Sequence, residues 1–205
     1  MTTSCPICGS TELTDFSSRP RALCVQCGAL ERQRALAVAF GPLFEAGEGR
    51  EVLEIGPLNA TVFGDYLRAR GWRYVSADRS RRGNPHDPRD VSFIDIESDA
   101  RKLSKIRNGT MDLVIAQHVI EEIPEYERAI SEVSRVLHGS GSALLEIPFD
   151  PSRLRSEPHQ PDGFGNVWRF GADLPETVRK YFAHVDIVSL AEQSFTGRLL
   201  ACRKS

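Results

Sequence analysis

Four cysteines lie in two pairs near the start of this 205-residue chain. Each pair has two residues between its members, fifteen residues separate the pairs, and the four are Cys5, Cys8, Cys24 and Cys27. This spacing lets four thiolates surround one cation in a tetrahedron. Gly9 and Gly28 follow the pairs, where the turn needs a residue that tolerates positive φ. The pattern favours a zinc site over two disulfides or a redox dithiol, and a closed four-cysteine shell predicts a structural zinc.

A second set of residues points to a bound nucleoside. The predicted strand Glu51–Ile55 runs into Gly56, where the missing Cβ lets a ligand approach the backbone. Asp78 ends the next predicted strand, and an acid at this spacing can accept two hydrogen bonds from ribose hydroxyls. Tight packing at Gly56 and a turn cap at Asp78 are the alternatives for each feature alone. Together the two features predict a nucleoside-binding sheet.

Two histidines are candidates for proton transfer or substrate contact. His118 follows a buried apolar run, and His159 lies in a segment rich in proline and glycine. A packing role for His118 and a solvated loop position for His159 are the alternatives. Glu121 and Glu122 are more typical of an acidic first helical turn than of catalytic carboxylates. The loop also holds two arginines suited to an anionic substrate and three aromatic residues expected mainly to anchor it: Arg153, Arg155, Phe164, Trp168 and Phe170.

The elements that position these residues alternate along the chain. Strands are predicted at 51–55, 74–77, 91–94, 113–116, 143–147, 185–190 and 199–202, and helices at 30–46, 62–70, 126–137 and 174–182. This alternation predicts an α/β fold with a doubly wound, mostly parallel sheet. We expect a ribbon over residues 1–29, a larger domain over 30–205, and a lid over 148–170, because that segment follows the carboxyl end of a strand.

Charge and hydropathy narrow the function classes. The net charge is −2, and residues 1–50 hold five arginines and five acidic side chains, so no basic excess favours nucleic acid. No stretch approaches the ~20 apolar residues of a membrane span, and the N-terminus lacks the pattern of a signal peptide. Four cysteines assigned to metal, with Cys202 expected to be a plain buried thiol, suggest a reducing compartment. These features predict a cytoplasmic protein with no membrane partner.

Several motifs give the chain a recognisable family likeness. Residues 52–56 resemble a glycine-loop motif, 99–103 (DARKL) resemble a DA-x-x-L motif, 111–121 are similar to an FD-V…HVLEH stretch, and 135–141 resemble an RVLKPGG turn. In this order they resemble class I S-adenosylmethionine-dependent methyltransferases. The cysteine pairs, followed by Glu31, Arg32 and Arg34, resemble a subgroup of that family with an N-terminal zinc ribbon.

The resemblance implies a seven-stranded, Rossmann-like methyltransferase sheet and S-adenosylmethionine as cofactor. The positions that match the family's cofactor-binding motifs are Glu54, Gly56, Pro57, Asp78, Asp99, Ala100, Gln117 and His118. Asp95 competes with Asp99 for the place beside the adenine. Leu58 and Ala60 depart from the pattern, because they stand where the family usually has glycines.

Three functions are compatible with these observations. The first is methyl transfer to a small-molecule acceptor by in-line displacement, which the neutral charge and the predicted lid favour. The second is a non-catalytic protein that uses the ribbon for docking, as Leu58 and Ala60 suggest. The third is an RNA methyltransferase whose local basic patch consists of Arg19, Arg21, Arg32 and Arg34. The sequence leaves the acceptor and the oligomeric state open, with a homodimer among the options.

Overall fold

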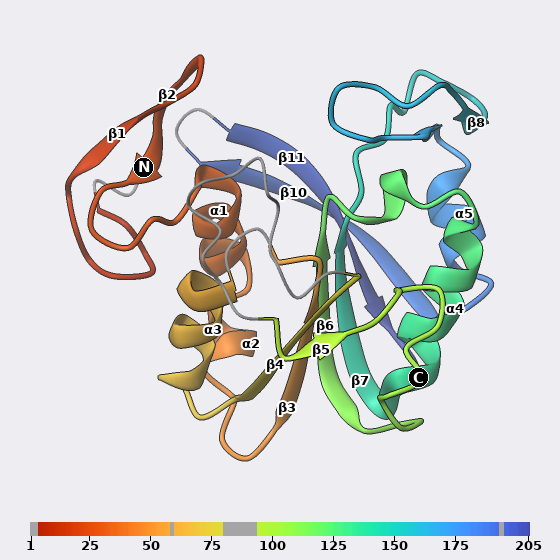
Figure 1. The fold of residues 1–205 in the computed structure, drawn as a ribbon, viewed down its shortest axis with the longest axis horizontal. Coiled ribbons are helices and arrows are strands. Elements are labelled where there is room, and N and C mark those ends of the chain that lie inside the picture. Colours follow the sequence, from red (N-terminus) through yellow and green to blue (C-terminus); the bar gives the residue numbers. More distant parts are fainter. Residues whose placement is uncertain (1–3, 58–59, 80–93, 193–194) are drawn as a thin grey trace.

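A seven-stranded sheet forms the centre of the molecule (Figure 1). The computed structural model describes residues 4–57, 60–79, 94–192 and 195–205. In spatial order the strands are β10 (His184–Glu192), β11 (Phe195–Arg203), β7 (Leu137–Glu146), β6 (Met111–Gln117), β3 (Glu51–Ile55), β4 (Arg73–Asp78) and β5 (Ile96–Glu97). The strands from β7 to β5 are parallel, whereas β11 is antiparallel to both β7 and β10. The predicted mostly parallel sheet of seven strands is confirmed.

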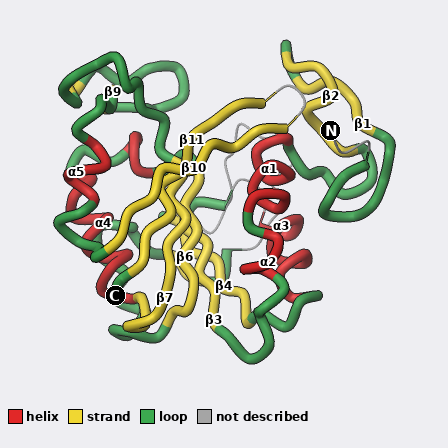
Figure 2. The backbone as a smooth tube through the Cα atoms, turned by 180° about the vertical axis from the view of Figure 1, so that it is seen from behind, coloured by secondary structure: helices red, strands yellow, loops and turns green. Residues whose placement is uncertain are grey.

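Helices cover both faces of this sheet (Figure 2). On one face lie α1 (Glu31–Ala39), α2 (Gly41–Phe44) and α3 (Ala60–Arg68), and on the other α4 (Tyr126–Val136) and α5 (Leu174–Val178). The sequence of α4 shows why it packs there. Its buried apolar residues recur at helical spacing and form one continuous face: Ala129, Ile130, Val133 and Val136.

The element bounds differ from the sequence predictions where local backbone chemistry intervenes. The helix predicted from Leu30 is divided at Phe40, because Pro42 cannot continue a helix and instead stands in the first turn of α2. The strand predicted at 143–147 starts earlier, at Leu137, and its pairing with β6 is irregular near that end. Of the strand predicted at 91–94, only Ile94 lies within the described residues, and the strand that pairs with β4 there is β5, further along the chain.

The predicted lid, residues 148–170, contains a small sheet made of β8 (Glu157–Pro158) and β9 (Trp168–Arg169). The rings of Trp168 and Phe170 each meet Tyr126 of α4 edge-on at 4.9 Å, and the Trp168 indole donates a hydrogen bond to the Pro124 carbonyl at 3.0 Å. These two residues anchor the segment, as predicted. Phe164 does not, because 86% of its surface is exposed.

The N-terminal segment forms a hairpin of β1 (Leu13–Phe16) and β2 (Arg19–Cys24) beside α1 and α3. Val62 of α3 packs in one apolar cluster with Cys5, Cys24 and Ala29. The hairpin and its cysteines therefore rest on the helices of the larger fold. Among the described residues, no helix has the length and apolar content needed to cross a membrane.

Candidate active site and cysteine cluster

The four cysteines predicted to bind zinc meet at one point of the structure. Their Sγ atoms all lie within 4.8 Å of one another, with Cys5 and Cys27 at 3.8 Å and Cys8 and Cys24 at 3.6 Å. A disulfide needs about 2.05 Å, whereas a tetrahedral shell with bonds of about 2.3 Å has edges near 3.8 Å. The donor set therefore fits zinc.

The turns around the cluster have the geometry that the sequence predicts. Gly9 and Gly28 have φ of 81° and 75°, and their amides donate to the carbonyls of Cys5 and Cys24 at 2.8 and 2.9 Å. A residue with a Cβ is strained at such φ values, so glycine is the residue that closes each turn without cost.

A cavity of about 1300 Å³ opens at the carboxyl ends of the parallel strands. The strand order reverses between β3 and β6, and open α/β sheets bind ligands at such a point. The ends of β3, β4 and β6, the turn after β5, η1 (Ile120–Glu122), the lid and the ribbon hairpin all contribute to its wall. The cavity is larger than the roughly 300–1,000 Å³ of a single small-molecule site. Its wall therefore extends beyond the strand ends to the hairpin and the lid segment.

Gly56 forms the tight turn at the floor of the cavity. Its φ is 58°, and a Cβ at this position would lie 2.5 Å from Cγ2 of Val119. Pro57 follows it in the cavity wall. Leu58 lies outside the described residues, and Ala60 is the first residue of α3. The turn thus depends on glycine at 56 for both its conformation and its space.

We predict that Gly56→Ala lowers the free energy of unfolding by about 1–3 kcal/mol, because alanine is strained at this φ and its methyl group would displace Val119. Gly139→Ala is the matched control, since an added Cβ there meets nothing within 4 Å. The control should change stability by no more than about 0.5 kcal/mol. Urea unfolding of the two variants measures both, and equal stabilities would contradict the prediction.

Of the four acids predicted at the cofactor site, Asp78 and Asp99 line the cavity. Asp78 ends β4 and accepts a hydrogen bond from the Arg79 amide at 2.5 Å, and Asp99 is held by the Arg101 guanidinium at 2.7 Å, which lowers the pKa of that carboxyl. Asp95 instead accepts bonds from both the amide and the hydroxyl of Ser76 at 2.8 Å. It is not among the described residues of the cavity wall. Between the rival acids, Asp99 is the one at the cavity, next to Ala100.

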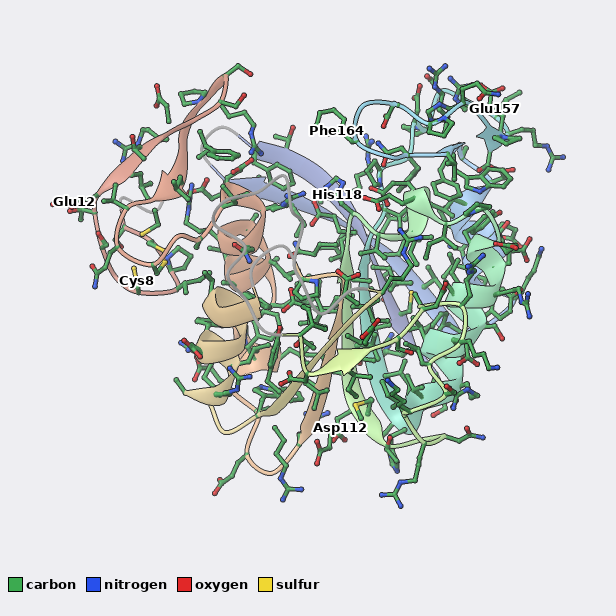
Figure 3. The ribbon with its side chains drawn as sticks, viewed as in Figure 1. Cys8, Glu12, Asp112, His118, Glu157 and Phe164 are labelled. Carbon is green, nitrogen blue, oxygen red and sulfur yellow. The ribbon has the colours of Figure 1, made fainter. Side chains whose placement is uncertain are left out.

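His118, labelled in Figure 3, follows the end of β6. It lies between two buried carboxylates. Its Nδ1 lies 3.0 Å from Oε1 of Glu121 and its Nε2 lies 3.4 Å from Oε1 of Glu146, while Gln117 donates to the other Glu146 oxygen at 2.6 Å. Its backbone is in the left-handed region, with φ of 54°. Burial alone would lower the pKa of His118, but the hydrogen bonds and charges of Glu121 and Glu146 raise it to about 9. The two carboxylates therefore favour the protonated imidazole.

This raised pKa predicts a pH-dependent contribution to stability. Because the folded pKa is about 9 and the ordinary value is 6.5, the contribution is complete below pH 6.5 and is lost as the pH rises through 9. His118→Asn keeps a residue that tolerates positive φ. Urea unfolding between pH 6 and pH 10 should show the largest difference between wild type and variant at the acidic end. A difference that grows with pH would refute the assignment.

Other predicted residues are not brought to the cavity, as far as the described residues show. Glu54 is buried in the sheet, where it accepts a hydrogen bond from the Tyr74 hydroxyl at 2.5 Å and burial raises its pKa to about 7. His159 lies in the lid with its amide bonded to the Val167 carbonyl, and it does not line the cavity. Arg153 contacts Glu157 within the lid.

The N-terminal segment and the 148–170 segment also contribute to the cavity wall. The ribbon contributes Phe16, Ser17, Ser18 and Arg19 from its hairpin, and α1 contributes Arg32. The exposed Phe164 and the half-buried Asn166 contribute from the 148–170 segment. No motif marks these residues, because the contact joins segments far apart in the chain.

Comparisons with known proteins identify the family. The sequence model of the methyltransferase domain family matches residues 29–194. No curated protein sequence matches the chain. Among solved structures, the fold is similar to that of 1,6-didemethyltoxoflavin-N1-methyltransferase of Burkholderia thailandensis, bound to 1,6-didemethyltoxoflavin and S-adenosylhomocysteine. That match has a TM-score of 0.59 and 15% identity, and covers 83% of this chain and 76% of that one.

Two further structures show the same likeness. Phospholethanolamine N-methyltransferase 2 of Haemonchus contortus has a TM-score of 0.56 at 16% identity, over 81% of this chain and 40% of that one. A methyltransferase dependent on S-adenosylmethionine from Aquifex aeolicus has a TM-score of 0.54 at 13% identity, over 82% and 89%. At these identities the likeness is one of fold, and it confirms the predicted class I methyltransferase fold. With the family model spanning most of its length, the chain belongs to the methyltransferase domain family.

Proposed function

We propose that this protein transfers a methyl group from S-adenosylmethionine to a small-molecule acceptor by in-line displacement. The observation that carries the proposal is the convergence of the motif residues on one cavity, at the point where the strand order reverses. The residues that we assign to the cofactor and that line this cavity are Gly56, Pro57, Asp78, Asp99, Ala100, Gln117 and His118. Structural neighbours that hold S-adenosylhomocysteine beside a small acceptor support it.

The chain's contribution to the reaction is binding, orientation and exclusion of water. Bound S-adenosylmethionine supplies a methyl group that the sulfonium already activates, so catalysis rests mainly on alignment at near-attack distance. Asp78 would accept the ribose hydroxyls. Asp99 would face the adenine end, with Arg101 fixing its carboxylate. The two carboxylates beside His118 favour its protonated form, so we assign this histidine a positioning role in the cavity floor and not that of a general base.

We further propose that the four cysteines hold a structural zinc ion. The sulfur separations support a closed tetrahedral shell. Such a shell has no position for substrate or water, so the metal would act on folding alone.

The structure weakens the RNA alternative. Arg34, one of four arginines in the predicted basic patch, has no exposed surface and bonds to Glu192. Arg19 pairs with the buried Glu31. Phosphate binding depends on basic side chains that reach the surface. The patch therefore lacks one of its four cations, Arg34, which favours a small-molecule acceptor.

Isothermal titration with S-adenosylhomocysteine tests the cofactor assignment. We expect saturable binding to the wild type and a loss of roughly 10–100-fold in Asp78→Ala, because hydrogen bonds to a charged group contribute about 1.5–3 kcal/mol. Asp65→Ala is the matched control, since Asp65 forms only a surface pair with Arg68. A wild type that releases no heat, or two variants of equal affinity, would reject the assignment.

Release of S-adenosylhomocysteine, measured over a panel of phenols, amines, carboxylic acids and thiols, then identifies the acceptor class. Turnover on at least one small molecule is expected. Cofactor binding without turnover on any panel member, combined with RNA methylation, would favour the RNA alternative.

A further inference from the structure

The tip of the ribbon hairpin is part of the reaction cavity. Phe16 ends β1, Arg19 starts β2, and the four residues 16–19 all line the cavity together with the motif residues of the sheet. In Figure 1 the hairpin and the lid stand at opposite sides of the carboxyl edge of the sheet, with the strands between them. The cofactor assignments above occupy the strand ends. The hairpin tip and the lid therefore remain as walls for the second ligand.

A bulge gives the hairpin the shape that brings its tip to the cavity. Thr14 pairs with Leu23 but Phe16 pairs with Arg19, so Asp15 alone faces residues 20–22 of the other strand. Such bulges bend a hairpin and re-aim its end, and they are frequent beside active sites. Arg21 within the bulge has φ of 51°, and its amide donates to Oδ1 of Asp15 at 2.9 Å. A non-glycine residue keeps this conformation only when its surroundings enforce it.

Arg34 of α1, which belongs to the larger domain, stabilises the bulge by hydrogen bonds. Its guanidinium donates to the carbonyls of Arg21 and Ala22, both at 3.0 Å, and to that of Ala29 at 3.1 Å. Its remaining bonds go to the two carboxylate oxygens of Glu192, at the end of β10, at 3.2 and 2.9 Å. All five N–H donors of the guanidinium are thus used. Arg34 has no exposed surface, so the contact is not exchanged with water.

A second ion pair holds the tip itself. Arg19 contacts the carboxylate of Glu31, a fully buried residue that begins α1. The Arg19 guanidinium also lies 5.3 Å from the centre of the Phe16 ring. The tip of the hairpin is therefore held to α1 through Arg19 and Glu31, and the bulge of the hairpin is held to α1 through Arg34. Two separate contacts fix its position relative to the sheet.

We propose that the hairpin tip, residues 16–19, forms one wall of the acceptor-binding site. Arg34, through its ion pair with Glu192 and its hydrogen bonds to the ribbon, is the residue that positions this tip. The inference rests on the proposed function, because it assigns a wall to the acceptor of that reaction. Phe16 offers an apolar face to the acceptor, and the serines at 17 and 18 offer hydroxyl groups. The metal ribbon then determines which acceptor fits, although the metal takes no part in methyl transfer.

A photoreactive cofactor analogue tests this without a known acceptor. The probe is S-adenosylhomocysteine with nitrogen in place of sulfur, carrying a short alkyl diazirine that extends from the position of the transferred methyl group. On irradiation of the full-length, zinc-loaded protein, we expect label on residues 16–19, located by fragmentation mass spectrometry, and its loss in excess S-adenosylhomocysteine. Label confined to the lid and the sheet, with none on the ribbon, would overturn the proposal.

Two pairs of variants separate contact from folding. Ser18→Trp should reduce probe affinity severalfold while leaving the affinity for S-adenosylhomocysteine unchanged, and Thr14→Trp, on an exposed position of the same hairpin, should change neither. Arg34→Lys should move the label away from the tip at full zinc content. Arg135→Lys, a similarly bonded arginine on α4, should not.

The outcomes distinguish this inference from the proposed function. If the wild type does not bind S-adenosylhomocysteine, the proposed function fails and the inference falls with it. If S-adenosylhomocysteine binds but Ser18→Trp weakens it as much as the probe, the tip contacts the cofactor and the inference alone is wrong. If Arg34→Lys keeps the wild-type label pattern, Arg34 is not the positioning residue.

Discussion

Glu192→Ala is expected to lower the free energy of unfolding by about 3–5 kcal/mol, because it leaves the buried Arg34 guanidinium without its counter-charge. Truncation of one member of a buried ion pair costs far more than the pair itself contributes. Arg34 cannot turn to water, since its other three bonds hold it to carbonyl groups of the ribbon. The alanine variant therefore contains a charge that is neither solvated nor paired.

Urea unfolding at pH 7 with zinc in excess measures this loss. Glu157→Ala is the control, because Glu157 forms an ion pair with Arg153 on the surface of the lid, and exposed pairs contribute about 0–1 kcal/mol. A loss below 1 kcal/mol for Glu192→Ala would show that the pair is more solvated than its burial indicates.

Cys24→Ser is expected to abolish stoichiometric zinc binding and to unfold the ribbon. Structural zinc contributes about 10–16 kcal/mol to the folding of small cysteine modules, and the apolar cluster of this ribbon is built around the same cysteines. Residues 4–29 should then become sensitive to proteases, while the sheet and its binding of S-adenosylhomocysteine survive. Acceptor turnover should fall, because the hairpin tip no longer completes the cavity.

Cys202→Ser is the matched control for metal binding. Cys202 is a buried thiol in β11, outside the cysteine cluster, and burial raises its pKa to about 12. This variant should retain one zinc ion per chain by elemental analysis. If Cys24→Ser loses cofactor binding while circular dichroism shows the sheet intact, the separation between a structural ribbon and a cofactor-binding sheet is wrong.

Local and periodic signals predicted most of the fold. The cysteines of each pair are close together in the sequence, so their spacing predicted the cluster directly. The apolar run of β6, residues 113–116, is continuous because this strand is buried on both faces, and it was predicted at the correct place in the chain. Bounds were least accurate near Pro42 and in the bulge of β7, where single residues decide the backbone path.

The contacts that complete the site were harder to predict, because they join distant segments. Arg34 and Glu192 are 158 residues apart, and in the sequence Arg34 looked like a surface cation. The carboxylates around His118 come from η1 and β7, so the contacts that favour its protonated form were not evident from the motif. Phe164 resembled a loop anchor and proved to be exposed at the cavity. The sequence shows that these residues are present, but it does not show which distant residues they contact.

The bonds that Arg34 makes to Glu192 and to three ribbon carbonyls also have an evolutionary consequence. A lysine has three donors and cannot reproduce the planar fork that serves three carbonyls and a carboxylate at once. If only one of Arg34 and Glu192 is replaced, the other remains buried without its charged partner. Selection should therefore replace the two residues together. In an alignment of relatives that carry the ribbon, positions 34 and 192 should therefore covary. Relatives without the ribbon should have an apolar residue at position 192, because a buried acid there would have no arginine as its partner.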